Sequence, residues 1–346
     1  MASPLRVLAG STAFAHIQQH GLRADDIKLL VGASGGPKWF CLYGLDQYLL
    51  AEFFKDRTQP LHLLGSSAGA WRFACYAQTD AVAASSRFAK AYSEVCYPKG
   101  ADIRLISRIS QAIIDEVLPT EQHLLQVLNN PVMKLNIIVD RARGLNKSTS
   151  PLLQGTGLML TASANLVSRR WLKHFYQRVH FHVADATEQF YHSASLPTEH
   201  VLLTKDNLKA AVIASGAIPM VLDPIADIAG AKPGRYFDGG ITDYHFDQPF
   251  IDNGLVLYPH FYPELIPGWF DKSLRWRRAK QAHLHNVVLL CPSNEWVASL
   301  PYGKIPDRKD FKLNDHTRIR YWQQVLARSQ ELAEAFATGN YQLALL

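Results

Sequence analysis

The pattern with the clearest chemical meaning is a GxSxG pentapeptide at residues 65–69, which read Gly-Ser-Ser-Ala-Gly. It follows an apolar run at 61–64 that predicts a short strand, and it opens a predicted helix that runs to residue 77. A serine at a sharp strand-to-helix turn is lifted out of the sheet, and Gly65 and Gly69 allow the close backbone approach of such a turn. The pattern therefore predicts that Ser67 is a nucleophile. The alternative is a small-residue turn that packs a helix on a sheet.

A second glycine-rich turn, Gly-Ala-Ser-Gly-Gly-Pro-Lys, occupies residues 32–38 between a predicted strand and a predicted helix. It has neither the Gly-Lys-Ser/Thr ending of a Walker motif nor the GxGxxG spacing. A turn of this kind can cradle a phosphate at the helix N-terminus. It can equally form an oxyanion hole, in which the backbone N–H groups of Gly35 and Gly36 point at a developing negative charge.

A third pattern places Asp238 before Gly239 and Gly240, after apparent strand residues. Most isolated Asp-Gly-Gly sequences are turns. A serine nucleophile needs a base, however, and an Asp in a poorly solvated pocket can accept its proton.

In this order, the three blocks and the segment Ala-Ser-Gly-Ala-Ile-Pro at 214–219 resemble the patatin-like phospholipase family over residues 27–250. The resemblance implies a Ser67–Asp238 dyad that works without histidine, and an oxyanion hole formed by Gly35 and Gly36 with Ser34. The motif positions that support these roles are Lys38, Gly65, Gly69, Gly239 and Gly240.

This chain departs from the family pattern at two positions of the glycine-rich turn. Ser34 stands where the family has the first of three glycines, and Trp39 replaces the glycine that follows the basic residue. The larger side chains are expected to narrow the acyl pocket or to reshape the loop.

Histidine offers a competing interpretation, because the chain has fourteen. An α/β-hydrolase has Ser, Asp and His in chain order, and four histidines follow Asp238: His245, His260, His283 and His285. The HGGG-type oxyanion motif of such enzymes is missing, so the Ser67–Asp238 dyad is favoured over a histidine triad. The pairs His180/His182 and His283/His285 have strand spacing, but they lack a nearby Cys or carboxylate partner, and no metal site is expected.

Short apolar runs alternate with amphipathic stretches along the chain, which predicts an α/β layered fold with a central, mainly parallel sheet flanked by helices. Strands are expected at 27–31, 61–64, 135–139, 158–161, 179–184, 201–203, 235–237 and 287–290. Helices are expected at 37–54, 68–77, 205–215 and 315–338. The aromatic stretch 259–269 suggests a core over 1–255 and a C-terminal extension over 256–346, packed on or beside the core. The helical segment 81–128 is a candidate lid.

Composition excludes several classes of protein. Hydrophobic residues make up 48% and charged residues 19% of the 346, which excludes a disordered chain, a coiled coil and a collagen-like repeat. The four scattered cysteines, none in a CxxC pair, argue against a disulfide scaffold or a structural zinc site and indicate a reducing compartment. No secretory signal is visible, and the uncharged stretch 148–168 is too polar to span a bilayer, so we expect a cytoplasmic protein.

The net charge of +6 is concentrated after an aromatic run, where five cations fall within nine residues. Basic residues among tryptophans suit an anionic membrane surface, which predicts peripheral contact. The residues expected to make it are Trp269, Arg275, Trp276, Arg277 and Arg278. The alternative is a solvated helix face beside an aromatic cluster. No nucleic acid partner is expected.

Together these features predict an acyl hydrolase that cleaves a lipid ester through an acyl-enzyme, with no cofactor or metal. Two alternatives remain open at this point. The same serine can serve an acyltransferase or thioesterase, and a non-catalytic lipid-binding scaffold can keep the same fold.

Overall fold

The computed structural model describes residues 3–184, 186, 196–250 and 253–346. The strands of these residues form one mixed sheet in the order β11-β1-β10-β9-β2-β3-β4-β5-β6. Its centre is a block of parallel neighbours: β10 (Val287–Pro292), β9 (Leu255–Pro259), β2 (Ile27–Gly32), β3 (Leu61–Ser66) and β4 (Met133–Ala142). An α/β fold with a mostly parallel sheet is thereby confirmed.

Antiparallel pairs bound this central block on both sides. On one side lie β1 (Leu5–Ala9), antiparallel to β10, and β11 (Gln342–Leu345). On the other side lie β5 (Tyr176–His182), antiparallel to β4, and β6 (Thr198–Leu202). The short β8 (Arg235–Asp238) also pairs with β4, and β7 (Ile225–Ala226) pairs with β8.

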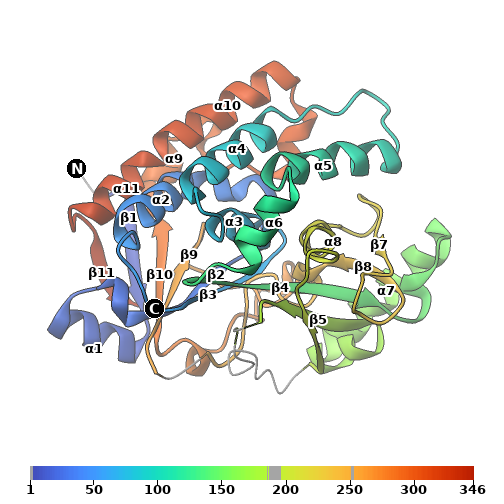
Figure 1. Ribbon diagram of the computed structural model, residues 1–346, viewed down its shortest axis with the longest axis horizontal. Coiled ribbons are helices and arrows are strands. Elements are labelled where there is room, and N and C mark those ends of the chain that lie inside the picture. Colours follow the sequence, from blue (N-terminus) through green and yellow to red (C-terminus); the bar gives the residue numbers. More distant parts are fainter. Residues whose placement is uncertain (1–2, 185, 187–195, 251–252) are drawn as a thin grey trace.

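Helices cover the sheet, as Figure 1 shows, with α4, α5 and α10 in an outer layer above α3. Their bounds are α1 (Ser11–His20), α2 (Tyr43–Tyr48), α3 (Ala68–Tyr76), α4 (Ala81–Glu94), α5 (Ile103–Val117), α6 (Glu121–Leu128), α7 (Pro151–Val167), α8 (Leu208–Ser215), α9 (Asn294–Ser299), α10 (Asp315–Arg328) and α11 (Gln330–Ala337). α3 packs directly on β2, β3 and β4. Because both faces of the central strands are covered, β3 and β10 are buried along their whole length. β10 is a continuous apolar run, and β3 is largely apolar apart from His62 and Ser66.

Most expected elements form, and two differ in kind. The expected helix at 37–54 begins as a 3₁₀ segment (Gly36–Leu42), continues as α2 and ends in a π turn (Leu49–Phe53). The strand expected at 158–161 is wrong, because these residues lie inside α7. A short apolar run does not distinguish a strand from a helix, and Pro151 at the first turn starts a helix that is much longer than the run.

The sheet continues across the boundary expected at residue 255. Residues after this point supply most of β9 and all of β10 and β11, and β9 lies between β2 and β10 at the centre of the sheet. Four strands were not expected from the sequence: β1, β7, β9 and β11. No helix in the described ranges is long and apolar enough to cross a bilayer.

Candidate active site

Ser67 occupies the turn between β3 and α3 in a conformation that is rare outside glycine, with φ 52° and ψ −126°. Holding a residue in such a region costs about 1–3 kcal/mol, so its surroundings must impose it. The Ser67 N–H donates to Ser215 Oγ at 2.9 Å, and Ser215 Oγ donates to the carbonyl of Ile138 at 2.7 Å. The end of α8 thus clamps the turn to β4.

The glycines of the pentapeptide are required by close packing. A Cβ on Gly69 would lie 2.0 Å from the carbonyl oxygen of Gly32, and a Cβ on Gly65 would lie 2.6 Å from the backbone nitrogen of Ala70. The absence of a side chain at Gly69 lets α3 pack closely on β2, and its absence at Gly65 lets the chain turn sharply between β3 and α3.

Asp238 ends β8 and faces Ser67, although the two residues are 171 positions apart in the chain. Ser67 Oγ donates to Asp238 Oδ2 at 2.8 Å, and the N–H of Gly240 donates to Asp238 Oδ1 at 2.7 Å. Both side chains are buried. A Cβ on Gly239 would lie 2.1 Å from the carbonyl oxygen of Ile138, so this glycine lets the turn pass close to β4.

Burial raises the pKa of Asp238 above its ordinary value, because the charged carboxylate loses water. The guanidinium of Arg308, the hydrogen bonds from Ser67 and Gly240, and the ammonium of Lys272 oppose this rise in pKa. A carboxylate with a raised pKa is a stronger base toward a serine hydroxyl. The environment of Asp238 therefore suits proton acceptance.

In the glycine-rich turn, Ser34 supports the loop, whereas Gly35 and Gly36 contribute buried amides without an acceptor in the described part of the chain. The Ser34 N–H donates to the carbonyl of Tyr244 at 2.9 Å, and Ser34 Oγ lies 2.8 Å from Ser66 Oγ. The amide of Ser34 is thus already bonded, and this residue anchors the loop. The N–H groups of Gly35 and Gly36 have no acceptor among the described residues, and Gly36 (φ 57°) lines the same cavity as Ser67.

Trp39 does not narrow that cavity. Its ring is buried and stacks on Phe88 of α4 with the centroids 4.6 Å apart, outside the cavity lining. Lys38 is half-buried nearby, and loss of water lowers the pKa of its ammonium group.

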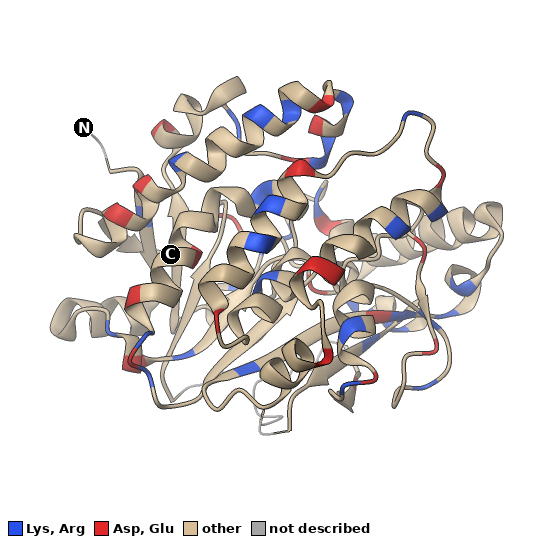
Figure 2. Ribbon diagram, turned by 45° about the horizontal axis from the view of Figure 1, so that its top comes forward, with Lys and Arg blue, Asp and Glu red and all other residues tan. Residues whose placement is uncertain are grey.

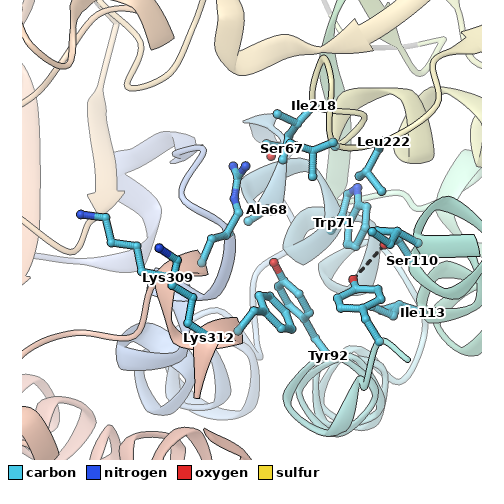
Figure 3. A pocket seen from close by; sticks show the side chains of 17 residues that line it. Ser67, Ala68, Trp71, Tyr92, Ser110, Ile113, Ile218, Leu222, Lys309 and Lys312 are labelled. Carbon is cyan, nitrogen blue, oxygen red and sulfur yellow. Dashed lines mark hydrogen bonds between the residues drawn. The ribbon is translucent and has the colours of Figure 1, made fainter. Parts of the chain in front are cut away.

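A cavity of about 500 Å³ opens beside Ser67. Figure 3 shows Ser67 at one end of it, Trp71, Tyr92 and Ile113 along the wall, and Lys309 and Lys312 on another side. Most of the lining is apolar or aromatic and comes from α3, α4, α5 and the loop after α8. Part of the expected lid segment 81–128 thus forms a wall of this cavity.

Arg308 also lies at the candidate site, although nothing in the sequence pointed to it. It begins the 3₁₀ segment η11 (Arg308–Lys312) and lines both the cavity beside Ser67 and a narrow space that holds Asp238. A Cβ on Gly36 would lie 3.3 Å from Arg308 Nε, which places the guanidinium next to the backbone of Gly36. Arg308 has no ion-pair partner in the described part of the chain. No local sequence pattern indicates this residue, because only the fold brings η11 to the glycine-rich turn at residues 32–38.

The histidines lie in other environments. His245 Nδ1 accepts the N–H of Ile266 at 3.0 Å, and His260 Nδ1 bonds to the backbone of Tyr262. His283 Nδ1 lies 2.8 Å from Asp247, and His285 Nδ1 lies 3.3 Å from the carbonyl of Ala282. Within the described residues none of them bonds to Ser67 or Asp238, so the contacts favour the dyad over a histidine triad.

His180 and His182 share one face of β5, as their spacing predicts. His180 Nε2 lies 2.9 Å from Asn136 Oδ1, and its Nδ1 lies 3.1 Å from His200 Nδ1. The described ranges contain no group of three or more His, Cys, Asp or Glu residues that could hold a metal ion.

The residues expected at a membrane differ in exposure. Trp269 is half-buried beside the Asp238 space, and Arg278 pairs with Glu264 at 3.1 Å. Arg277 is bonded to protein acceptors, whereas Trp276 is 71% exposed and Arg275 is also exposed.

No family model matches the chain, and no curated protein matches it. One solved structure to which the chain is similar is the crystal structure of VipD from Legionella pneumophila, at 14% identity and a TM-score of 0.34. The match covers 75% of this chain and 53% of that chain, about half its length. A likeness this weak indicates neither fold nor function, so any function proposed for this chain has to be argued from the geometry of the site.

Proposed function

We propose that this protein is a serine acyl hydrolase of lipid esters, of the patatin-like type, with Ser67 as nucleophile and Asp238 as its base. The observation that carries the proposal is the 2.8 Å hydrogen bond from Ser67 Oγ to Asp238 Oδ2 at the end of a largely apolar cavity. A nucleophile within hydrogen-bond reach of its base is the geometry that acyl transfer requires.

In the first half-reaction Ser67 Oγ attacks the ester carbonyl carbon while Asp238 accepts the hydroxyl proton. The carbonyl oxygen becomes an oxyanion, which the N–H groups of Gly35 and Gly36 stabilise. The bond to the alcohol then breaks, the alcohol takes the proton from Asp238, and an acyl-enzyme remains. Water attacks this ester with Asp238 again as base, the carboxylic acid leaves and the Ser67 hydroxyl is restored.

The cavity favours an acyl chain as the group that is transferred. Its wall of Trp71, Tyr92 and Ile113 offers apolar surface beside the nucleophile. The reaction needs no cofactor or metal, since the base, the nucleophile and the oxyanion donors all come from the chain.

Labelling with a fluorophosphonate tests this proposal, because the probe phosphonylates an activated serine and releases fluoride. We expect the wild type to become labelled and Ser67→Ala to remain unlabelled. The labelling rate of Asp238→Asn should be lower than that of the wild type by a factor of about 100 or more. His245→Ala, with folding checked by circular dichroism, is the control and should keep its label. Loss of labelling in a folded His245→Ala would favour a histidine triad, and a folded wild type that never labels would refute the hydrolase.

Product analysis with a labelled ester separates hydrolysis from acyl transfer. Release of free acid in the absence of an acceptor is expected. Product that forms only when an alcohol or thiol acceptor is added would instead identify an acyltransferase.

A further inference from the structure

Helix α7 has its polar side inward and its apolar side in solvent, the reverse of an ordinary surface helix. Six of its seven large apolar residues are exposed: Leu152, Leu153, Met159, Leu160, Leu166 and Val167. Four residues face the protein: Gln154, Gly157, Thr161 and Asn165. Only Leu158 among the large apolar residues packs inward.

Hydrogen bonds fix this orientation. Asn146 Nδ2 donates to Thr161 Oγ1 at 2.9 Å, and Asn165 Nδ2 donates to the buried Asp271 at 2.7 Å. A Cβ on Gly157 would lie 2.4 Å from Asn146 Oδ1, so the helix sits tightly against the segment before it. Rotation of α7 to hide its apolar side would leave these buried polar groups without partners.

Two exposed tryptophans extend the apolar surface. Trp171 follows α7 in the 3₁₀ segment η5 (Arg169–His174) and is 49% exposed. Trp276 is 71% exposed, and the next residue, Arg277, donates to the carbonyls of Asn165 and Leu166 at the end of α7. Indole rings beside an apolar surface are typical of a membrane interface.

The segment that contains α7 is basic. Residues 141–184 contain seven Lys and Arg residues and no Asp or Glu, and α7 itself has no charged residue. The helices above the sheet, in contrast, have charges of both signs (Figure 2). Four exposed cations near α7 have no ion-pair partner among the described residues: Lys147, Arg170, Lys173 and Arg275.

We infer that α7, with Trp171 and Trp276, docks the protein on an anionic lipid bilayer, with the helix lying in the plane of the interface. An apolar helix face with cations at its rim matches acyl chains below and anionic headgroups around it. A symmetric contact with a second copy would set the same cations against each other, which opposes dimerisation through this face.

The docking surface meets the candidate site through one short turn. Asp271, which holds Asn165, belongs to the 3₁₀ segment η8 (Trp269–Asp271), and Trp269 of this turn lines the space beside Asp238. The inference goes beyond the proposed function, because docking needs neither Ser67 nor Asp238.

Vesicle co-sedimentation of the Ser67→Ala protein tests docking without turnover. We expect it to bind vesicles of phosphatidylcholine with about one third phosphatidylglycerol, and less to phosphatidylcholine alone. In this background, Leu152→Ser/Met159→Ser/Val167→Ser should weaken binding about tenfold or more. The matched control Leu125→Ser/Tyr302→Ser/Leu345→Ser changes exposed apolar residues elsewhere and should bind within about twofold of its parent.

A second set separates charge from apolar contact. Arg170→Gln/Lys173→Gln/Arg275→Gln should lose only the preference for anionic vesicles, while Lys90→Gln/Lys99→Gln/Arg320→Gln should keep it. Unchanged binding of the folded α7 serine variant would overturn the inference. Sedimentation velocity gives a second outcome that would overturn it: the parent protein is a dimer, the α7 serine variant is a monomer, and both bind vesicles.

Discussion

At the scale of single residues, the chemistry depends on a buried carboxylate. Because burial raises the pKa of Asp238 in the folded state, its charge destabilises the fold at neutral pH, and this penalty disappears at pH values below the unfolded-state pKa. We expect Asp238→Asn to lower kcat by about 10²–10⁴-fold and to raise Tm at pH 7. Thermal unfolding across pH checks the sign, since the gain in Tm should vanish in acid. A gain of equal size at every pH would contradict this account.

Arg308 also acts on Asp238, since its guanidinium lowers the pKa of that carboxyl. Arg308→Gln removes this charge, so the pKa of Asp238 should rise. We expect the acidic limb of the kcat/KM profile for a neutral ester to move to higher pH, because a base with a higher pKa becomes protonated at a higher pH. Lys309→Gln, a neighbouring exposed cation, is the control and should leave the limb in place. Restoration of the wild-type profile by Arg308→Lys would show that charge, and not shape, is responsible.

At the scale of elements, the strand–turn–helix unit β3–α3 is stabilised by close packing, which its glycines permit because they let the helix contact the sheet. Gly69→Ala would place a methyl group 2.0 Å from the carbonyl oxygen of Gly32, and we expect a loss of about 2–4 kcal/mol in the free energy of unfolding. Gly155→Ala is the matched control: a Cβ there meets nothing within 4 Å inside α7, so we expect a gain of about 0.5–1 kcal/mol. Denaturant unfolding measures both. Equal effects of the two substitutions would argue against close packing at Gly69.

At the scale of the whole molecule, the segment after residue 255 completes the sheet. A chain of residues 1–255 would lose β10 and all but the first residue of β9, which leaves the buried edge of β2 unpaired, so we expect it not to fold. A chain that ends at residue 340 loses only the outermost strand, β11, and should fold with a lower Tm. Circular dichroism and thermal unfolding distinguish the two outcomes. A cooperatively folded 1–255 chain would show that the core is independent.

Local pattern in the sequence was enough to predict the α/β class, the strand–turn–helix unit around Ser67 and the turn at Asp238, because backbone freedom at glycine and short-range periodicity determine these features. It did not distinguish a strand from a helix at 158–161, since an apolar run suits both. The pairing of Ser67 with Asp238 was expected only through the resemblance to a family, and the tertiary structure gives the contact itself, at 2.8 Å. The tertiary structure alone brought Arg308 to Gly36 and turned the apolar side of α7 outward. These features arise from contacts between residues that are far apart in the chain, and so no local pattern contains them.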